Sequence, residues 1–102
     1  MSDKVQMAFV GCGGIAHSHA QGYGRLAEAG YDRFNFTAVC DTNEENAREM
    51  VTFLKENAGM EPTPYTSVEE MLDAEDIDAV DNCTPHAYHH TTAIPSLERG
   101  IA

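Results

Sequence analysis

One short stretch near the N-terminus constrains the fold of this chain more than any other. An apolar run at residues 5–10 is followed directly by Gly11, Gly13 and Gly14, and Ile15 and Ala16 then begin a segment suited to a helix. A strand, a glycine-rich turn and a helix start in immediate succession are typical of the phosphate-binding corner of a dinucleotide-binding α/β fold. The stretch therefore predicts a strand-turn-helix unit that can hold an anion.

Each small residue in this turn meets a separate requirement. Gly11 allows the tight turn, Gly13 leaves room for a pyrophosphate beside the backbone, and Ala16 is small enough for the helix to pack closely on the strand. The helix start supplies unpaired N–H groups and the positive end of its dipole. No Lys or Arg lies between Lys4 and Arg25. We therefore predict that phosphate is held by the backbone, with five contacting residues: Gly11, Gly13, Gly14, Ile15 and Ala16.

A second strand that ends in an acidic residue should follow such a turn, because that residue accepts hydrogen bonds from the adenosine ribose. Residues 33–41 supply it, and strict alternation places one set of side chains on the same face: Phe34, Phe36, Ala38 and Cys40. Asp41 comes 28 residues after Gly13 (41 minus 13). The usual separation is about 20 residues, and we attribute the excess to an extended connection at residues 28–33.

The residues after Asp41 bear on the choice of cofactor. Thr42 and Asn43 follow it, and neither is a base that could receive a 2′-phosphate. The sequence therefore favours NAD over NADP. An alternative role for Asp41 is to cap the next helix, and the two roles can coexist.

Helices and strands alternate along the rest of the chain. Thr42 with Glu45 and Ser67 with Glu70 form capping boxes that begin two helices, and Gly59 ends the first of them. The remaining predicted elements are a strand at 65–66, a strand at 77–83 and a helix at 88–99 that is kinked at Pro95. This order predicts an α/β fold with a Rossmann-like, doubly wound and mainly parallel sheet.

The composition excludes several kinds of partner. The chain has 6 Lys and Arg against 17 Asp and Glu, a net charge of −11, which disfavours nucleic acid and anionic membranes. No apolar run approaches about 18 residues and no charged-then-apolar leader precedes the fold, so we expect a cytoplasmic protein. Cys12, Cys40 and Cys83 are odd in number and lie at predicted strands, which favours reduced thiols over a disulfide.

Several segments carry a family resemblance when they are taken in order: residues 9–16 with His19, residues 39–41, 78–80, 84–89 and 93–100. Together they resemble the N-terminal half of the glucose-fructose oxidoreductase, inositol dehydrogenase and MocA family, over essentially the whole chain. The resemblance implies an NAD(P)-dependent oxidoreductase that transfers hydride to or from a sugar, polyol or related alcohol. It also implies four residues close to the ribose and nicotinamide: Thr84, Pro85, His86 and His89. At His86 the family more often has asparagine.

The same resemblance predicts segments that do not follow in this sequence. Relatives continue into a fifth strand ending in glutamate-lysine-proline, whose lysine helps to bind substrate and transfer a proton, and then into a substrate domain. Residues 1–102 are therefore expected to be a partial Rossmann domain, incomplete after the fourth βα unit, without catalytic residues and inactive alone. The strand at 79–83 would then be an unprotected edge, which predicts marginal stability or a homo-oligomer.

Other interpretations of the same residues remain open. One set of side chains follows the first and fourth strands and would form a zinc cluster at one rim: Cys12, His17, His19, Cys83, His86, His89 and His90. Their spacing matches no standard zinc motif, so we predict no metal site. Cys12 lies at a helix N-terminus, as redox thiols do, but its place in the glycine turn favours a small filler. A noncatalytic nucleotide-binding or assembly module is the alternative function.

Overall fold

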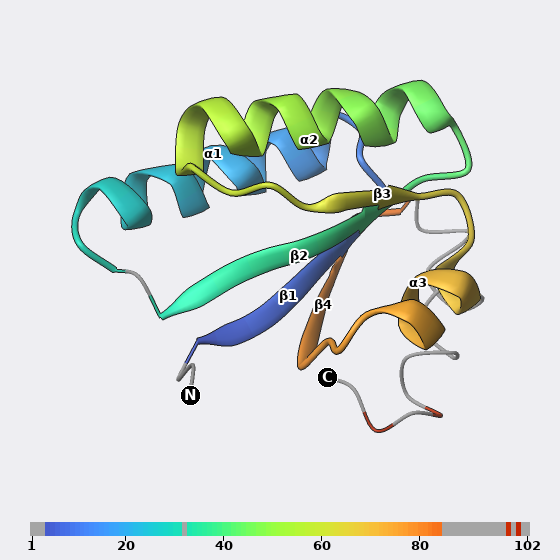
Figure 1. Cartoon of the computed structure of the whole chain (residues 1–102). Coiled ribbons are helices and arrows are strands. Elements are labelled where there is room, and N and C mark those ends of the chain that lie inside the picture. Colours follow the sequence, from blue (N-terminus) through green and yellow to red (C-terminus); the bar gives the residue numbers. More distant parts are fainter. Residues whose placement is uncertain (1–3, 32, 85–97, 99, 101–102) are drawn as a thin grey trace.

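The computed structural model describes residues 4–31, 33–84, 98 and 100, and its centre is a parallel sheet with helices on both faces (Figure 1). The strands are β1 (Val5–Val10), β2 (Phe34–Cys40), β3 (Thr63–Tyr65) and β4 (Ala79–Asn82), and the helices are α1 (Gly14–Glu28), α2 (Glu44–Ala58) and α3 (Val68–Ala74). The strand order is β3-β2-β1-β4 and every pair is parallel. The predicted Rossmann-like α/β fold is confirmed.

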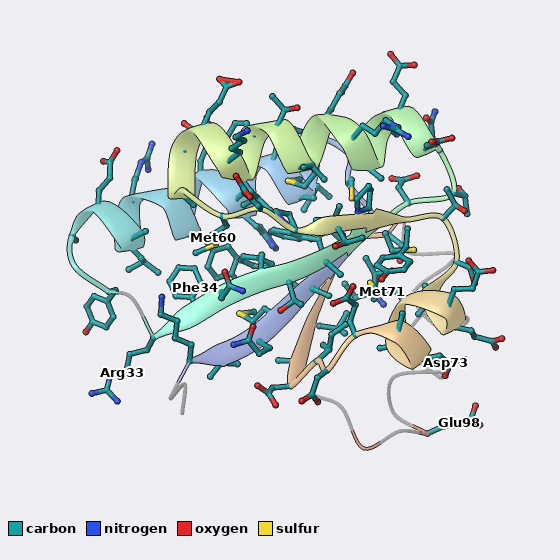
Figure 2. The ribbon with its side chains drawn as sticks, viewed as in Figure 1. Arg33, Phe34, Met60, Met71, Asp73 and Glu98 are labelled. Atoms are coloured by element: carbon teal, nitrogen blue, oxygen red, sulfur yellow. The ribbon has the colours of Figure 1, made fainter. Side chains whose placement is uncertain are left out.

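Two apolar clusters hold the layers together, one on each face of the sheet. Helices α1 and α2 cover the first face, whose buried side chains are Phe9, Cys12, Ala16, Ala20, Phe36, Val39, Ala47, Met50, Leu54 and Met60. Helix α3 covers the second face, whose buried side chains are Ala8, Val10, Ala38, Cys40, Met71, Leu72 and Ile77. Figure 2 shows Phe34 and Met60 on the side of α1 and α2, and Met71 beside α3.

Strand β2 contains one residue more than its partner. The backbone pairs Met7 with Phe36 and then Ala8 with Ala38, so Thr37 is an extra residue in the ladder. Such a β-bulge leaves one residue unpaired and reverses the alternation of side chains beyond it.

This bulge overturns the predicted distribution of β2 side chains. Phe36 belongs to the cluster under α1 and α2, whereas Ala38 and Cys40 belong to the cluster under α3. Val39, predicted to lie opposite Phe36, shares its face. The prediction that Phe34, Phe36, Ala38 and Cys40 share one face is therefore wrong, because strict alternation does not hold across a bulge.

The ends of α2 follow local capping rules. The N-cap is Asn43, whose side-chain oxygen accepts hydrogen bonds from the N–H groups of Glu45 (3.0 Å) and Asn46 (3.3 Å). The predicted capping box starting at Thr42 is therefore wrong by one position, and the side chain of Asn43 takes the capping role. Gly59 ends the helix in the left-handed conformation, with φ of 67°, as predicted.

The remaining predictions differ mainly at element ends. Ser67 caps α3 by accepting from the N–H of Glu70 (3.3 Å), as predicted. Strand β3 begins at Thr63 and not at Tyr65, and β4 is shorter than the predicted 77–83. The helix predicted at 88–99 lies outside the described residues apart from Glu98. Strand β4 is the last strand on its side of the described sheet, and its association with a second copy stays a prediction.

None of the helices in the described ranges combines the length and the hydropathy that a membrane crossing requires.

Candidate functional site

A cleft of about 980 Å³ lies where the carboxyl ends of β1, β2 and β4 meet. Its lining residues come from the ends of β1 and β2, from the loops that follow the four strands and from the starts of α1, α2 and α3: Val10, Gly11, Gly13, Gly14, Ile15, Cys40, Asp41, Thr42, Asn43, Asn46, Thr66, Val68, Cys83 and Thr84. Strand β2 lies on one side of β1 and β4 lies on the other, so the direction of the strand order reverses at β1. The carboxyl end of the sheet at β1 is therefore a topological switch point. In open α/β sheets, such a point is where ligands bind.

Gly11 is required at the end of β1 for two reasons. Its φ of 87° lies in the left-handed region that other residues rarely adopt. In addition, a Cβ at this position would come within 2.8 Å of the backbone of Cys83 and Thr84. The predicted tight turn is confirmed. The close approach of the chain after β4 is a second reason that the sequence alone did not reveal.

The next two glycines border open space. A Cβ on Gly13 or Gly14 would meet nothing within 4 Å, and both residues line the cleft. Gly13 is the N-cap of α1, receives no side-chain cap, and no acidic residue occupies the first turn. The first N–H groups of a helix have no partners within the helix. Ala16 is fully buried against the sheet, whereas Ile15 is 65% exposed at the rim of the cleft.

The carboxylate of Asp41 joins the glycine turn to the start of α2. One of its oxygens accepts a hydrogen bond from the N–H of Cys12 (2.9 Å), and the other accepts from the N–H of Asn43 (2.8 Å). Asp41 thus orients the cap of α2, while Asn43 is the cap itself. An ionised carboxylate has about four acceptor positions, so each oxygen retains capacity for one more donor.

Cys12 is buried beneath the turn. Its thiol donates to the carbonyl oxygen of Cys40 (3.4 Å), and only 1% of the residue is exposed. Burial, together with the nearby Asp41 carboxylate, raises the pKa of the thiol to about 12. A thiol that stays protonated is a poor nucleophile. These properties agree with the prediction that Cys12 is a small filler.

Polar side chains gather around β4, next to Cys83, which lines the cleft. The Nδ1 atom of His19 lies 3.0 Å from the nearer Asp81 oxygen and 3.4 Å from the Cys83 sulfur. The Cys83 thiol donates to the other Asp81 oxygen (3.1 Å), and the Tyr23 hydroxyl donates to the nearer one (3.1 Å). Burial, and next the hydrogen bond to Asp81, raises the pKa of Cys83 to about 12.

Sequence reasoning anticipated this cluster only in part. It expected His19 and Cys83 at one rim, and the structure brings them together. It missed Asp81, although a residue two before Cys83 on a strand points to the same side. The ring of His17 packs against Phe53 instead, with ring centroids 5.0 Å apart. Three other predicted site residues, Pro85, His86 and His89, lie outside the described residues, as does His90.

Thr84 is the last described residue after β4 that lines the cleft. Its N–H and its hydroxyl both donate to the side-chain oxygen of Asn82, at 3.2 and 2.7 Å. The Asn82 side chain therefore stabilises the turn that brings Thr84 into the cleft lining.

Comparison with known proteins relates the chain to one large group. A sequence model described as "Oxidoreductase family, NAD-binding Rossmann fold", with the label GFO_IDH_MocA, matches residues 5–102. Among solved structures, the WlbA dehydrogenase from Bordetella pertussis, determined in complex with NADH and UDP-GlcNAcA, is 31% identical with a TM-score of 0.70. The match covers 96% of this chain and 27% of that protein.

Other similar proteins carry different names, although each match again covers 96% of this chain. The myo-inositol 2-dehydrogenase from Lactobacillus plantarum has the same fold, with a TM-score of 0.72 at 24% identity, over 96% of this chain and 26% of its own. A glycosyl hydrolase family 109 protein from Shewanella pealeana is 29% identical over 96% of this chain. The chain spans about a fifth (21%) of the length of that curated relative.

Proposed function

The chain belongs to the Gfo/Idh/MocA oxidoreductase family, as its NAD-binding Rossmann part, and from this premise we propose that its cleft binds NAD(H) in preference to NADP(H). The observation that carries the proposal is the position of Asp41, whose carboxylate is held at the cleft by two backbone N–H groups. A carboxylate at this point accepts hydrogen bonds from a ribose diol and repels a 2′-phosphate.

The glycine turn would hold the pyrophosphate. Side chains at Gly13 and Gly14 would project into open space at the cleft, so their absence leaves the first N–H groups of α1 accessible. The dipole of this fifteen-residue helix favours an anion at the same end. These features fit the pyrophosphate without a basic side chain. Among the described residues lining the cleft, none is Lys or Arg.

The β4 end of the cleft would receive the nicotinamide half. Thr84 lines the cleft there, and the family resemblance adds Pro85, His86 and His89 as proposed neighbours. When bound, the dinucleotide supplies a hydride acceptor or donor. The role of the described residues is to bind and orient it, and we assign no catalytic residue among them.

We further propose that the longer protein to which this part belongs acts on a sugar or polyol. The WlbA dehydrogenase was solved in complex with NADH and UDP-GlcNAcA. A second candidate is cleavage of a glycosidic bond, because curated relatives at 29% identity are named glycosyl hydrolase family 109 protein and alpha-N-acetylgalactosaminidase. Both candidates imply a carbohydrate substrate beside a nucleotide-binding cleft.

Calorimetric titration of the chain with NAD, NADP and ADP-ribose tests the binding proposal. We expect heat with NAD and with ADP-ribose, and weaker binding of NADP. Equal affinity for NAD and NADP would contradict the role of Asp41. No heat at millimolar NAD with folded protein would refute the proposal and leave the assembly module as the alternative.

The activity proposal is tested by sequencing the DNA downstream of the Ala102 codon. We expect the frame to continue through a strand ending in glutamate-lysine-proline into a second domain. The encoded protein is then assayed for NADH formation with sugars and polyols, and for release of sugar from glycosides. A stop codon directly after Ala102 would contradict the enzyme proposal for this chain.

A further inference from the structure

We propose that His19, Asp81 and Cys83 form a binding site for Zn²⁺ at the β4 end of the sheet. One ligand atom from each residue lies within 4.8 Å of the other two. Cys83 also lines the cleft proposed for NAD, but zinc binding by these three side chains does not require a bound dinucleotide. It differs from the zinc cluster considered from the sequence, since it contains Asp81 and excludes Cys12 and His17.

The spacing of the three atoms approximates one face of a zinc coordination tetrahedron. Bond lengths of about 2.0–2.2 Å to N and O and about 2.3 Å to S imply ligand-to-ligand edges of about 3.3–3.6 Å. The observed edges are 3.2 Å between His19 Nδ1 and Asp81 Oδ1, 3.1 Å between Asp81 Oδ1 and Cys83 Sγ, and 3.4 Å between Cys83 Sγ and His19 Nδ1. To reach the edges expected for bound zinc, each side chain would move outward by only a few tenths of an ångström.

The donor set matches the chemistry of zinc. One imidazole nitrogen, one carboxylate oxygen and one thiolate sulfur are all established zinc ligands. The Asp81 carboxylate and the Cys83 thiolate together would balance the two positive charges of the ion. On binding, the Cys83 proton, which is donated to Asp81 in this structure, is released to solvent. No oxidant or reductant is needed.

Asp81 is held in place by a second partner. The hydroxyl of Tyr23 donates to its carboxylate at 3.1 Å. The Tyr23 ring packs against Phe9, Phe34 and Phe36, with centroids 5.9, 5.3 and 4.8 Å away. An outer hydrogen bond of this kind fixes a metal-ligating carboxylate.

The elements that carry the ligands leave one side accessible. His19 lies on α1, and Asp81 and Cys83 lie two residues apart along β4 and its end. The side chain of His19 is 48% exposed, whereas that of Asp81 is 14% exposed. An ion can therefore enter from the His19 side, and water would complete a four-coordinate site.

The first test uses the chain after removal of metal with a chelator, dialysed against Zn²⁺ and then measured for bound metal. We expect one zinc per chain, and Co²⁺ as a probe should give a thiolate-to-cobalt charge-transfer band. His19→Ala and Cys83→Ser should each abolish stoichiometric binding. His17→Ala is the matched control, because this histidine is on the same helix but contacts Phe53. The His17→Ala variant should bind one zinc per chain, as the parent chain does.

Two further measurements keep the test decisive where a ligand variant does not fold. Tyr23→Phe retains the ring and should weaken zinc binding by about 10–100-fold, as loss of an outer partner does. In the parent chain, zinc should raise the melting temperature, because an ion that binds the folded chain stabilises it. Absence of stoichiometric zinc, or binding unchanged in His19→Ala and Cys83→Ser, would overturn the proposal. A melting temperature unchanged by zinc would do so as well.

Discussion

At the scale of single residues, the Asp41 carboxylate holds the backbone of two segments and is proposed to bind the cofactor as well. Its two oxygens already accept from the backbone of the glycine turn and of the α2 start, and the same oxygens are proposed to receive the ribose hydroxyls. On this proposal, Asp41 links the stability of the turn to the affinity for the cofactor.

Replacing Asp41 tests both roles. Asp41→Ala should weaken NAD binding by roughly 1 to 3 kcal/mol, the scale for losing charge-assisted hydrogen bonds, and should also lower the melting temperature. Calorimetry with NAD and thermal unfolding measure the two effects. Asp41→Asn, which keeps one acceptor oxygen, should lie between the parent and Asp41→Ala. An unchanged affinity in Asp41→Ala would remove this residue from the site.

Cys12 should resist thiol reagents in the folded chain. Because burial and Asp41 raise the pKa of this thiol to about 12, little thiolate exists near neutral pH. Mass spectrometry after alkylation at about pH 8 should find Cys12 unmodified, and a denatured sample under the same reagent should be fully modified. Rapid modification in the folded state would restore the interpretation of Cys12 as a redox thiol.

The same pKa shift has a consequence for stability at high pH. The ordinary pKa of 9.0 applies in the unfolded chain, and the folded value is higher. The stability that the chain gains from keeping the Cys12 thiol protonated is therefore fully present below about pH 9. It is lost as the pH rises toward 12, because the thiol then ionises in the folded chain as well. Burial raises the pKa of Cys40 in the same direction, to about 11.

At the scale of elements, the contact between the ends of β1 and β4 depends on Gly11. Gly11→Ala should destabilise the chain by about 2 kcal/mol or more, because it combines a left-handed φ with a backbone collision at 2.8 Å. Denaturant unfolding measures the loss. Gly14→Ala is the control, since its Cβ would meet nothing within 4 Å, and it should unfold within about 0.5 kcal/mol of the parent. Equal stability of both variants would contradict the argument.

Most elements could be predicted from the sequence, because apolar spacing and capping residues are local signals. The pattern predicted the strand-turn-helix unit, the parallel sheet, Asp41 after β2 and the helix end at Gly59. What the sequence could not show depends on pairing between segments far apart. The bulge at Thr37 exists only relative to β1, and the contact of His19 with Asp81 joins residues 62 positions apart.

At the scale of the whole molecule, the excess of acidic residues should make stability depend on salt. Because the net charge is −11, the carboxylates of the folded chain repel one another. Raising NaCl from about 0.01 M to 0.15 M shortens the screening length from about 30 Å to 8 Å, so the melting temperature should rise. The Glu56→Lys variant changes an exposed position near the end of α2. Its melting temperature should rise less steeply with salt than that of the parent chain. A melting temperature that falls with NaCl would contradict this prediction.

The extra residue in β2 also limits how this chain can change in length. The Gln6 side chain accepts hydrogen bonds from Asn35 (3.1 Å), which precedes the bulge, and from Thr37 (2.8 Å), the extra residue itself. Beyond it, alternation brings Asp41 to the same side as Phe36 and Val39, toward the turn that contains Cys12. Deleting Thr37 would leave every other residue type in place and turn the acid to the opposite side. We therefore expect β2 to tolerate substitutions more readily than a change of one in its number of residues.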